Sequence, residues 1–594
     1  MQTEMTPPIP TSGSPTPPSA RIEALDVVRG FALIGIFLMN IEWFNRSSSG
    51  IGLGMPLGLT GIDWFASWFI AYFIQGKFWT IFSLLFGMGF AVMLKRADQA
   101  GRPFMVSYLR RILGLAIFGA AHYIFLWNGD ILFSYSVGAI ALLILLYGEW
   151  KKILTAMAVL VGIGFIPGAD SAFGLAGVLA FILLQTVFLR VERKVGFGER
   201  KLPVFAMVLL VLGTVGLIAA IVFWVLPNGP KEPRVPVTVL SITMLFFSVL
   251  SAKFHDPKNL RELRLGVGIY SFSFLMAIIF GAIQYLKPPE STKPPAAVAT
   301  TAATPKLAAA SEITKPAADS SAAARAPQPV ASAASEPAAV AKSADAKTDK
   351  KPELTDAEKA AKKKADRAKR LAEREAEIQH ETRILSSGTY LEAVEIRARK
   401  FPGKVLEDAG FGTVLAAMFL LGSWFVRSGI MDNTAAHLPL FRKLALYGLP
   451  IGIGMGLAGS LIAVSHIPGD DYDGFQLARG LAMLGNLPAC LGYVGLVVVM
   501  LHSNTVFSKI RVLAPAGRMA LTTYLTQSVI CSLVFFGYGL GYWGLDRAWQ
   551  VVFVAVVFTI QLAFSRWWLA RYRFGPLEWV WRAFTYRESP AMRR

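Results

Sequence analysis

The segment GAAHYIFLWNGDILFSY, residues 119–135, carries a histidine, His122, and an acid, Asp130, within a strongly apolar part of the chain. His122 lies eleven residues after Arg111, which is about 16 Å along a helix. Ionisable groups at membrane depth are rare and usually face a cavity or a partner. Imidazole titrates near neutral pH, so His122 is a candidate general base or proton relay. The alternative is a neutral imidazole that only joins two helices.

Asp130 ends the WNGD turn, residues 127–130, and starts the next apolar run. A carboxylate at this position is suited to accept backbone N–H groups at the start of a helix. It is equally suited to orient His122, as in a base–orienter pair, and the two roles are compatible. Asn40 is flanked by apolar residues and is expected to hydrogen-bond either another helix or a substrate. His122, Asp130 and Asn40 are therefore the candidate catalytic residues.

Long apolar runs dominate the 594-residue chain, which is 54% hydrophobic and 16% charged and has a mean hydropathy of +0.49. Runs of about 20 residues are long enough to span a hydrocarbon core about 30 Å thick. The net charge of +20 fits basic loops beside membrane spans better than nucleic-acid binding. The two cysteines, Cys490 and Cys531, lie inside apolar runs, which argues against a disulfide framework. We predict an all-α, polytopic transmembrane bundle.

The apolar runs predict about 14 spans, and the basic loops predict their orientation. Lysine and arginine are concentrated at residues 95–111, 149–152, 190–201 and 253–264 and in the C-terminal segment. Short cytoplasmic loops carry such residues, so we expect both termini in the cytoplasm and the WNGD turn outside. The short pair of runs around Pro167 could instead be re-entrant. The expected spans are residues 24–45, 65–94, 111–127, 131–148, 152–167, 172–189, 203–226, 236–252, 266–286, 410–427, 444–464, 478–501, 517–537 and 547–569.

The composition divides the chain into four regions. Residues 1–20 are rich in Pro, Ser and Thr and are expected to form a disordered tail rather than a signal peptide. Residues 21–286 form an N-terminal transmembrane domain, and residues 381–594 form a C-terminal one. Between them, residues 287–380 are an Ala/Pro/Ser/Lys-rich linker, expected to be disordered and outside. The linker ends in a charged, solvated helix predicted at residues 354–381.

Several blocks resemble the YeiB family of bacterial inner-membrane proteins. LDVVRGFALIGIFLMNI (residues 25–41), GKFWTIFSLLFGMGF (76–90) and AAHYIFLWNGDILFSYSVGAI (120–140) are similar to its N-terminal half. APAGRMALTTYLTQSVICSLVF (514–535) and FGPLEWVWRAFTYR (574–587) are similar to its C-terminal domain of unknown function. The resemblance implies a multi-pass protein of the bacterial inner membrane. Residues 150–286 match less well and hold extra spans.

The YeiB family in turn resembles a wider group of transmembrane acyltransferases. This group includes heparan-glucosaminide N-acetyltransferase and the bacterial sugar O-acetyltransferases, which transfer an acyl group from cytoplasmic acyl-CoA to an acceptor on the far side. The shared mark is Leu-Asp, then Arg-Gly, then a polar residue eleven positions after the Arg. In this sequence Asp26, Arg29 and Asn40 occupy those positions. The loop that follows has no histidine, unlike that of the heparan enzyme.

Further polar residues are candidates for binding a substrate or donor. Asp26 and Arg29 share a helix face, and arginine suits a phosphate group; the alternative is a juxtamembrane ion pair. Lys77 starts an apolar run, where its side chain could instead reach the membrane surface. The stretch GRMALTTYLTQS adds a polar stripe that lines a cavity or holds helices together. The candidates are Asp26, Arg29, Lys77, Arg518, Thr523, Tyr524 and Gln527.

The sequence and the resemblance favour a membrane-embedded acyltransferase. It would take an acyl group from acyl-CoA and pass it to an extracytoplasmic glycan, lipid or other acceptor with a hydroxyl or amine. A proton-coupled transporter of a small solute or lipid and a non-catalytic membrane protein are the alternatives. No P-loop, dinucleotide fingerprint or Cys/His metal spacing occurs in the sequence, so no metal is expected. The expected partner is the lipid bilayer, and the sequence leaves the oligomeric state open.

Overall fold

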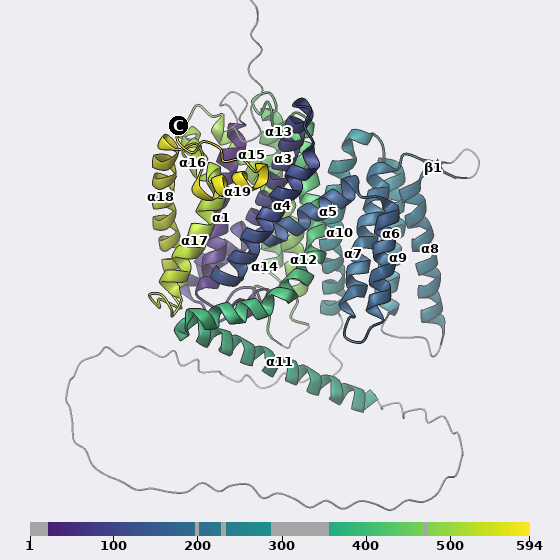
Figure 1. Cartoon of the computed structure of the whole chain (residues 1–594). Coiled ribbons are helices and arrows are strands. Elements are labelled where there is room, and N and C mark those ends of the chain that lie inside the picture. Colours follow the sequence, from purple (N-terminus) through teal and green to yellow (C-terminus); the bar gives the residue numbers. More distant parts are fainter. Residues whose placement is uncertain (1–21, 197–200, 227–232, 287–355, 469–471) are drawn as a thin grey trace, which may run out of the picture. The chain divides into compact units, whose positions relative to one another are not determined.

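The structure is a computed structural model that describes residues 22–196, 201–226, 233–286, 356–468 and 472–594 (Figure 1). The tail at residues 1–20 and residues 287–355 of the low-complexity linker lie outside these ranges. The described chain is almost entirely helical. Its one sheet is the antiparallel pair β1 (Lys194–Val195) and β2 (Leu202–Pro203), in which Lys194 pairs with Pro203.

The helices follow one another with short connections. The N-terminal half contains α1 (Glu23–Asn40), η2 (Ile41–Phe44), η3 (Ser48–Gly50), α2 (Gly61–Phe69), η4 (Ile70–Ile74), α3 (Lys77–Gln99), α4 (Phe104–Ala121), η5 (His122–Leu126), α5 (Leu132–Tyr147), α6 (Trp150–Gly164), α7 (Ser171–Arg190), α8 (Val204–Val225), α9 (Arg234–Phe254), η6 (Lys258–Leu260) and α10 (Arg261–Leu286). The C-terminal half contains α11 (Asp356–Ser387), α12 (Tyr390–Arg427), α13 (Leu438–Lys443), η7 (Leu444–Gly448), α14 (Leu449–Ser460), α15 (Phe475–Leu501), η8 (Val506–Leu513), α16 (Ala514–Arg518), α17 (Ala520–Phe535), α18 (Arg547–Arg571) and α19 (Pro576–Tyr586).

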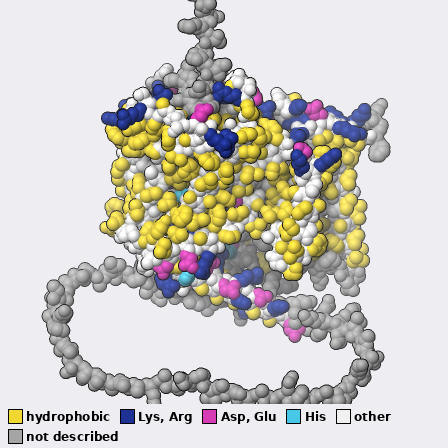
Figure 2. Space-filling model, in the orientation of Figure 1, with side chains coloured by type: hydrophobic (Ala, Val, Ile, Leu, Met, Phe, Trp, Pro, Cys, Tyr) yellow, Lys and Arg dark blue, Asp and Glu magenta, His cyan; other side chains and the backbone are white. Residues whose placement is uncertain are grey.

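The predicted all-α polytopic fold is confirmed. Within the described ranges, eleven helical segments are long and apolar enough to cross a membrane, and α5 and α17 are shorter apolar helices. Each of the 14 expected spans falls on a helix. Thirteen of them correspond to the eleven segments and to α5 and α17. The fourteenth is α6, which has only 15 residues and begins Trp-Lys-Lys. The pair around Pro167 consists of the two helices α6 and α7, which pack against each other. Hydrophobic side chains cover the middle of the visible face (Figure 2).

α12 begins earlier than expected. The sequence predicted a span from residue 410, whereas the helix starts at Tyr390 and continues to Arg427. Thr389 and Glu392 form a capping box: the Thr389 hydroxyl accepts from the Glu392 N–H, and the Glu392 carboxylate accepts from the Thr389 N–H. This reciprocal cap fixes the start of the helix. The predicted charged helix is confirmed as α11, which extends to Ser387.

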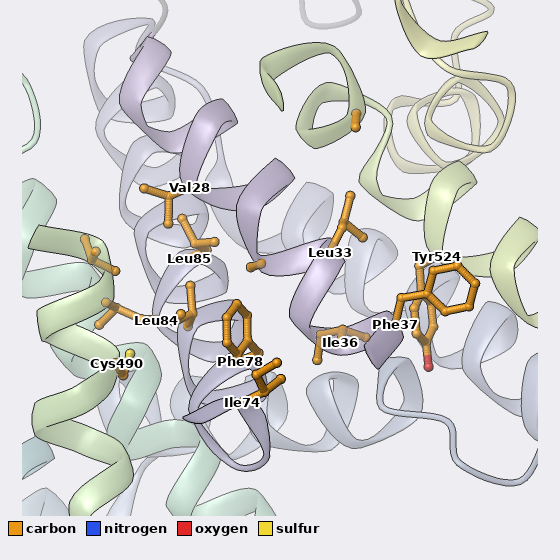
Figure 3. Packing of buried hydrophobic residues seen from close by; sticks show 14 of the residues in the cluster. Val28, Leu33, Ile36, Phe37, Ile74, Phe78, Leu84, Leu85, Cys490 and Tyr524 are labelled. Atoms are coloured by element: carbon orange, nitrogen blue, oxygen red, sulfur yellow. The ribbon is translucent and has the colours of Figure 1, made fainter. Parts of the chain in front are cut away.

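The transmembrane helices from both halves of the chain share one core. The described parts of residues 22–286 and 369–594 belong to one compact unit. Within this unit, Val28, Leu33 and Phe37 of α1 cluster with buried residues of α3, α15 and α17 (Figure 3). Twelve of the 18 residues of α1 are buried, so the helix lies in the interior of the bundle. The domains expected at residues 21–286 and 381–594 therefore do not have separate cores.

The basic loops gather on one side of this unit. Arg190 donates to the Gly148 carbonyl at 2.6 Å, Lys194 pairs with Asp256 at 3.0 Å, and the Trp581 indole donates to the Arg111 carbonyl at 3.0 Å. We call this side, with the loops after α3, α5, α7 and α9 and the segment after α18, the basic face. In Figure 2 its Lys and Arg side chains lie along the upper edge. The loops expected in the cytoplasm thus share one face.

Candidate functional site

His122 sits where α4 changes its winding. The helix ends at Ala121, and residues 122–126 form a single π-helical turn in which the Trp127 N–H donates to the His122 carbonyl at 2.8 Å. Such π turns often occur at functional sites. The His122 side chain is buried, with 2% of its surface exposed. The winding change therefore presents the imidazole inside the bundle rather than to lipid.

Asp130 both orients His122 and caps α5. Its Oδ1 lies 2.8 Å from His122 Nδ1, and its Oδ2 accepts from the Phe133 N–H at 2.7 Å. The two roles considered from the sequence therefore hold together. An ionised carboxylate can only accept a hydrogen bond, so with Asp130 ionised the proton of a neutral imidazole lies on Nδ1 and Nε2 is the acceptor.

Ser528 of α17 occupies that acceptor. Its Oγ lies 2.8 Å from His122 Nε2, and its side chain is almost completely buried. Ser528 therefore supplies a hydroxyl, His122 a base and Asp130 an acid that orients the base. Nucleophile triads are recognised by this arrangement, irrespective of sequence position. Sequence reasoning missed Ser528, although it follows Gln527 in the polar stripe and lies one helical turn after Tyr524.

A cavity of about 300 Å³ approaches this triad from the basic face. Tyr135 and Tyr524 lie at its inner end, and the Tyr524 ring contacts the His122 ring with centroids 5.2 Å apart. The outer part carries the guanidinium groups of four arginines. These are Arg29 of α1, Arg111 of α4, Arg518 of α16 and Arg582 of α19.

The charge at the mouth of the cavity is predominantly positive. Arg29 pairs with Asp26 at 3.1 Å, and the Arg111 guanidinium stacks on the Trp581 ring at 3.8 Å. Among the residues that the structure describes, Glu578 is the one carboxylate that lines the cavity. It accepts from the Leu521 N–H at 2.7 Å and the Thr522 hydroxyl at 2.6 Å, so it caps α17. Burial raises the pKa of Glu578, while the hydrogen bonds from Thr522 act to lower it. Arginine clusters of this kind bind phosphate groups.

Two glycines bring the arginines of α1 and α16 together. A Cβ atom at Gly517 would lie 1.9 Å from the Asp26 carbonyl oxygen, and one at Gly30 would lie 2.2 Å from the Leu513 carbonyl oxygen. Only glycine allows the two backbones to approach so closely. Arg29 and Arg518 adjoin these glycines in sequence and consequently lie at one mouth. The prediction that Asp26 and Arg29 share a face is confirmed.

Besides His122, Asp130 and Asp26, four sequence-predicted residues do not line the cavity. Asn40 is buried at the end of α1, and no hydrogen bond to His122 is present among the described residues. Lys77 is completely buried at the start of α3, so it does not reach the membrane surface. Gln527 donates to Gln561 of α18 at 3.1 Å, and Gln561 in turn donates to the Thr523 carbonyl at 3.1 Å. Thr523 and Gln527 therefore hold α17 to α18.

The opposite face of the triad is closed by a polar contact between α11 and the loop after α1. Glu381 accepts from the hydroxyls of Ser47 and Ser48 at 2.6 Å and of Ser49 at 2.7 Å, and lies 3.3 Å from Lys400. Burial alone would raise the pKa of Glu381, but the serine hydrogen bonds and Lys400 lower it to about 2. The same loop contacts the WNGD turn, because Asn128 donates to Ser48.

Arg397 of α12 reinforces this closure. Its guanidinium donates to the carbonyls of Ile124 and Leu126, at 3.0 and 2.7 Å, in the turn that carries His122. Glu381 and Arg397 could not be found from the sequence, because both follow the long linker and contact residues more than 200 positions away. The two contacts place α11 and α12 over the end of the triad that is remote from the arginines.

Comparison with known proteins identifies the C-terminal part of the chain. Residues 425–588 match the family described as Protein of unknown function (DUF418). The chain carries a DUF418 domain and is a relative of YeiB. It is 30% identical to the uncharacterized protein YeiB of Escherichia coli (strain K12) over 200 residues, which is 34% of this chain and 51% of YeiB. The resemblance to the YeiB family predicted from the sequence is thus confirmed.

Two further relatives extend the similarity. The uncharacterized protein YxaH of Bacillus subtilis (strain 168) is 22% identical over 586 residues, which is 97% of each chain. An uncharacterized 39.9 kDa protein in the amylase 3' region of Bacillus acidopullulyticus is 40% identical over 105 residues, 18% of this chain and 28% of that protein. No solved structure matches the chain significantly. The DUF418 domain supplies Ser528, Tyr524 and Arg518, whereas His122 and Asp130 come from outside it.

Proposed function

We propose that this protein is a membrane-embedded acyltransferase that passes an acyl group from acyl-CoA to an acceptor across the membrane. One observation carries the proposal: the Ser528–His122–Asp130 chain lies next to the inner end of a cavity whose mouth holds four arginines. The wider acyltransferase resemblance of the first-helix motif supports the same reading. The basic face is assigned to the cytoplasm of a bacterial inner membrane, because basic short loops stay there.

The cavity is the donor site in this proposal. The arginines would hold the phosphate groups of coenzyme A at the mouth, and the narrower inner part would hold the pantetheine arm. The thioester would then reach the Tyr524 end, beside His122. The Tyr524 hydroxyl is positioned to donate a hydrogen bond to the oxygen on which charge develops, a type of stabilisation that enzymes use widely.

In the first step, Ser528 Oγ attacks the thioester carbonyl and its proton moves to His122 Nε2. Asp130 holds the Nδ1–H and stabilises the imidazolium that forms. The tetrahedral intermediate collapses, the carbon–sulfur bond breaks, and His122 gives the proton to the departing thiolate. The products of this step are an ester of Ser528 and free coenzyme A.

In the second step, a hydroxyl or amine of the acceptor attacks the Ser528 ester. His122 takes the acceptor's proton and returns it to Ser528 Oγ as the carbon–oxygen bond to the serine breaks. The acceptor is a glycan, a lipid or another extracytoplasmic molecule, and it reaches the triad from the side that Glu381 and Arg397 close. Because Ser528 holds the acyl group as a covalent ester, the donor side and the acceptor side of the triad can open one after the other. Donor and acceptor therefore need not be bound at the same time.

The test uses the full chain purified in lipid nanodiscs with radiolabelled acetyl-CoA. The proposal expects free thiol to be released and one acetyl group per chain to be retained after denaturation, located on Ser528 by peptide mass spectrometry. The readout needs no knowledge of the acceptor. Absence of both thiol release and labelling would reject the enzyme. Proton-coupled uptake of a solute into proteoliposomes, without acyl labelling, would support a transporter instead.

A further inference from the structure

A second cavity lies in the part of the chain, residues 150–286, that resembles the YeiB family less well. It has a volume of about 290 Å³ and is enclosed by α7, α8, α9 and α10. Its walls are almost entirely apolar, with phenylalanines such as Phe181, Phe247 and Phe272 prominent. It shares no lining residue with the arginine-mouthed cavity. The triad and the donor site therefore do not account for it.

The few polar groups of this cavity gather at its basic-face end. Gln185 lies five residues before the end of α7, Ser251 lies three residues before the end of α9, and Arg264 lies in the first turn of α10. These three helix ends all meet at the basic face. The deeper wall is formed by apolar side chains, from Phe247 down to Leu240. The cavity is thus polar near the surface and apolar toward the bilayer centre.

Two of these polar groups are buried without a partner. Gln185 is 3% exposed and Ser251 is 6% exposed, and neither Gln185 Nε2 nor Ser251 Oγ has a hydrogen-bond partner among the described residues. An unsatisfied polar group in an apolar setting costs free energy. The two donors therefore point to a ligand with acceptor oxygens at this depth.

Arg264 adds a positive charge at the cavity mouth. Its guanidinium donates to the carbonyls of Phe254 and Asp256, and no carboxylate pairs with it in the described parts of the chain. Nearby carboxylates are already engaged: Asp256 pairs with Lys194 and with Arg261, and Glu262 pairs with Arg427. Arg264 therefore favours an anionic group at the surface end of the cavity.

The length of the cavity matches one membrane leaflet. From Ser251 to Leu240 is eleven residues of α9, or about 16 Å of helix, close to half of the roughly 30 Å hydrocarbon core. Leu240 and Leu250 line the cavity and are 42% and 39% exposed, so the cavity is open toward the surrounding lipid. A lipid chain can enter sideways without leaving its leaflet.

From these observations we infer that the α7–α10 cavity binds one acyl chain of an anionic phospholipid from the leaflet at the basic face. The chain lies along Phe247 and Phe272. The ester oxygens accept hydrogen bonds from Gln185 and Ser251, and the phosphate lies beside Arg264. This inference is independent of the acyltransferase proposal, because it concerns a different cavity and a lipid that is not consumed.

The test uses the full chain in nanodiscs of phosphatidylcholine that contain a phosphatidylglycerol with a photoreactive diazirine on one acyl chain. We expect adducts on peptides from α7, α9 and α10. Unlabelled phosphatidylglycerol should compete more strongly than unlabelled phosphatidylcholine. The variant Arg264→Gln should lower the adduct yield about fivefold, in line with the attraction of one basic residue to anionic lipid, whereas Lys152→Gln on the exposed part of the same face should not.

Gly268 provides a blocking variant. It lines the cavity, and a Cβ atom there would have no atom within 4 Å, so Gly268→Phe fills the cavity without a backbone clash. Gly174 of α7 has equally open surroundings but does not line the cavity, so Gly174→Phe is the matched control. Loss of adducts in Gly268→Phe alone, with unchanged thermal unfolding of both variants, supports the site. Adducts that persist in Gly268→Phe, or equal competition by both lipids, would overturn it.

Discussion

Ser528 Oγ lies 2.8 Å from His122 Nε2, although 406 residues separate the two in the chain. The contact joins α17 of the DUF418 domain to the π turn after α4. Asp130 occupies the other imidazole nitrogen, so all hydrogen-bonding positions of the ring are used. A buried, fully paired chain of this kind is suited to move a proton from the serine hydroxyl without solvent.

The first prediction concerns His122. Glutamine has a similar size and supplies one donor and one acceptor end, so His122→Gln should insert and fold normally. It takes up no proton, so acyl transfer should fall at least about 100-fold, the usual contribution of a general base. Asp130→Asn should weaken transfer less, because its amide oxygen can still accept the Nδ1–H. Measurement of thiol release from acetyl-CoA checks both, and full activity of His122→Gln would refute the catalytic assignment.

The second prediction separates the serine ester from direct transfer. Ser528→Ala should retain the fold, losing about 1 kcal/mol of stability with one hydrogen bond, and should form no covalent acyl-protein. Ser532→Ala is the control, because Ser532 is also buried on α17 but donates to the Val529 carbonyl, at 3.0 Å, and not to His122. If Ser528→Ala still transfers acyl groups at the wild-type rate, transfer is direct and His122 activates the acceptor itself.

The local half of this site could be predicted from the sequence, and the distant half could not. Asp130 follows His122 by eight residues across a short turn, so their proximity depends on local geometry alone. Ser528 reaches His122 only because α17 packs beside η5, the turn after α4, and hydropathy does not specify which helices are neighbours. For the same reason, the role of Gln527 could not be predicted. Its helical face was correctly expected to be polar, but its partner Gln561 lies on another helix, α18.

The fold was more predictable than the site because bilayer thickness constrains each span independently. Every expected apolar run coincides with a helix, since a run of about 20 apolar residues must satisfy its own backbone groups in hydrocarbon. The start of α12 was missed because residues 390–399 include four charged side chains and so form no continuous apolar run. Their helix is fixed by the Thr389–Glu392 cap rather than by hydrophobicity.

The third prediction concerns the donor phosphates. Arg518→Gln and Arg582→Gln should each raise the KM for acetyl-CoA about tenfold, the loss expected for one charge-assisted hydrogen bond, with little change in kcat. The effect should disappear with acetyl-pantetheine, which lacks the nucleotide phosphates. Arg571→Gln is the control, because Arg571 stacks on Trp567 at 4.7 Å and does not line the cavity. Equal KM increases for both donors would show that the arginines do not bind phosphate.

The fourth prediction concerns orientation. Leu540→Cys, in a residue that is 70% exposed on the face opposite the basic loops, should react with an impermeant thiol reagent in intact cells. Lys152→Cys on the basic face should react only after permeabilisation. The native Cys490 and Cys531 are both buried and should give little background. The reverse labelling pattern would place the arginine-mouthed cavity outside and would contradict a cytoplasmic donor.

The fifth prediction concerns the closure formed by Glu381. Because the pKa of this carboxyl falls from 4.5 to about 2 on folding, its ionised form stabilises the folded state above pH 4.5. That contribution is lost as the pH falls from 4.5 toward 2. Glu381→Gln keeps the size of the side chain and removes the charge. The variant should therefore unfold at a lower temperature than the wild type at pH 7, by an amount equivalent to at most about 3 kcal/mol, and the difference should shrink at pH 3.

Thermal unfolding of the detergent-solubilised protein at the two pH values measures this difference. Glu395→Gln is the matched control, because Glu395 forms an exposed i,i+4 pair with Arg399, and such pairs contribute at most about 0.5 kcal/mol. Its unfolding temperature should stay near the wild-type value at both pH values. If Glu381→Gln lowers the unfolding temperature by the same amount at pH 7 and pH 3, the serine hydroxyls require the shape of the side chain and not its charge. In that case α11 is not held over the WNGD turn by an ionised carboxylate.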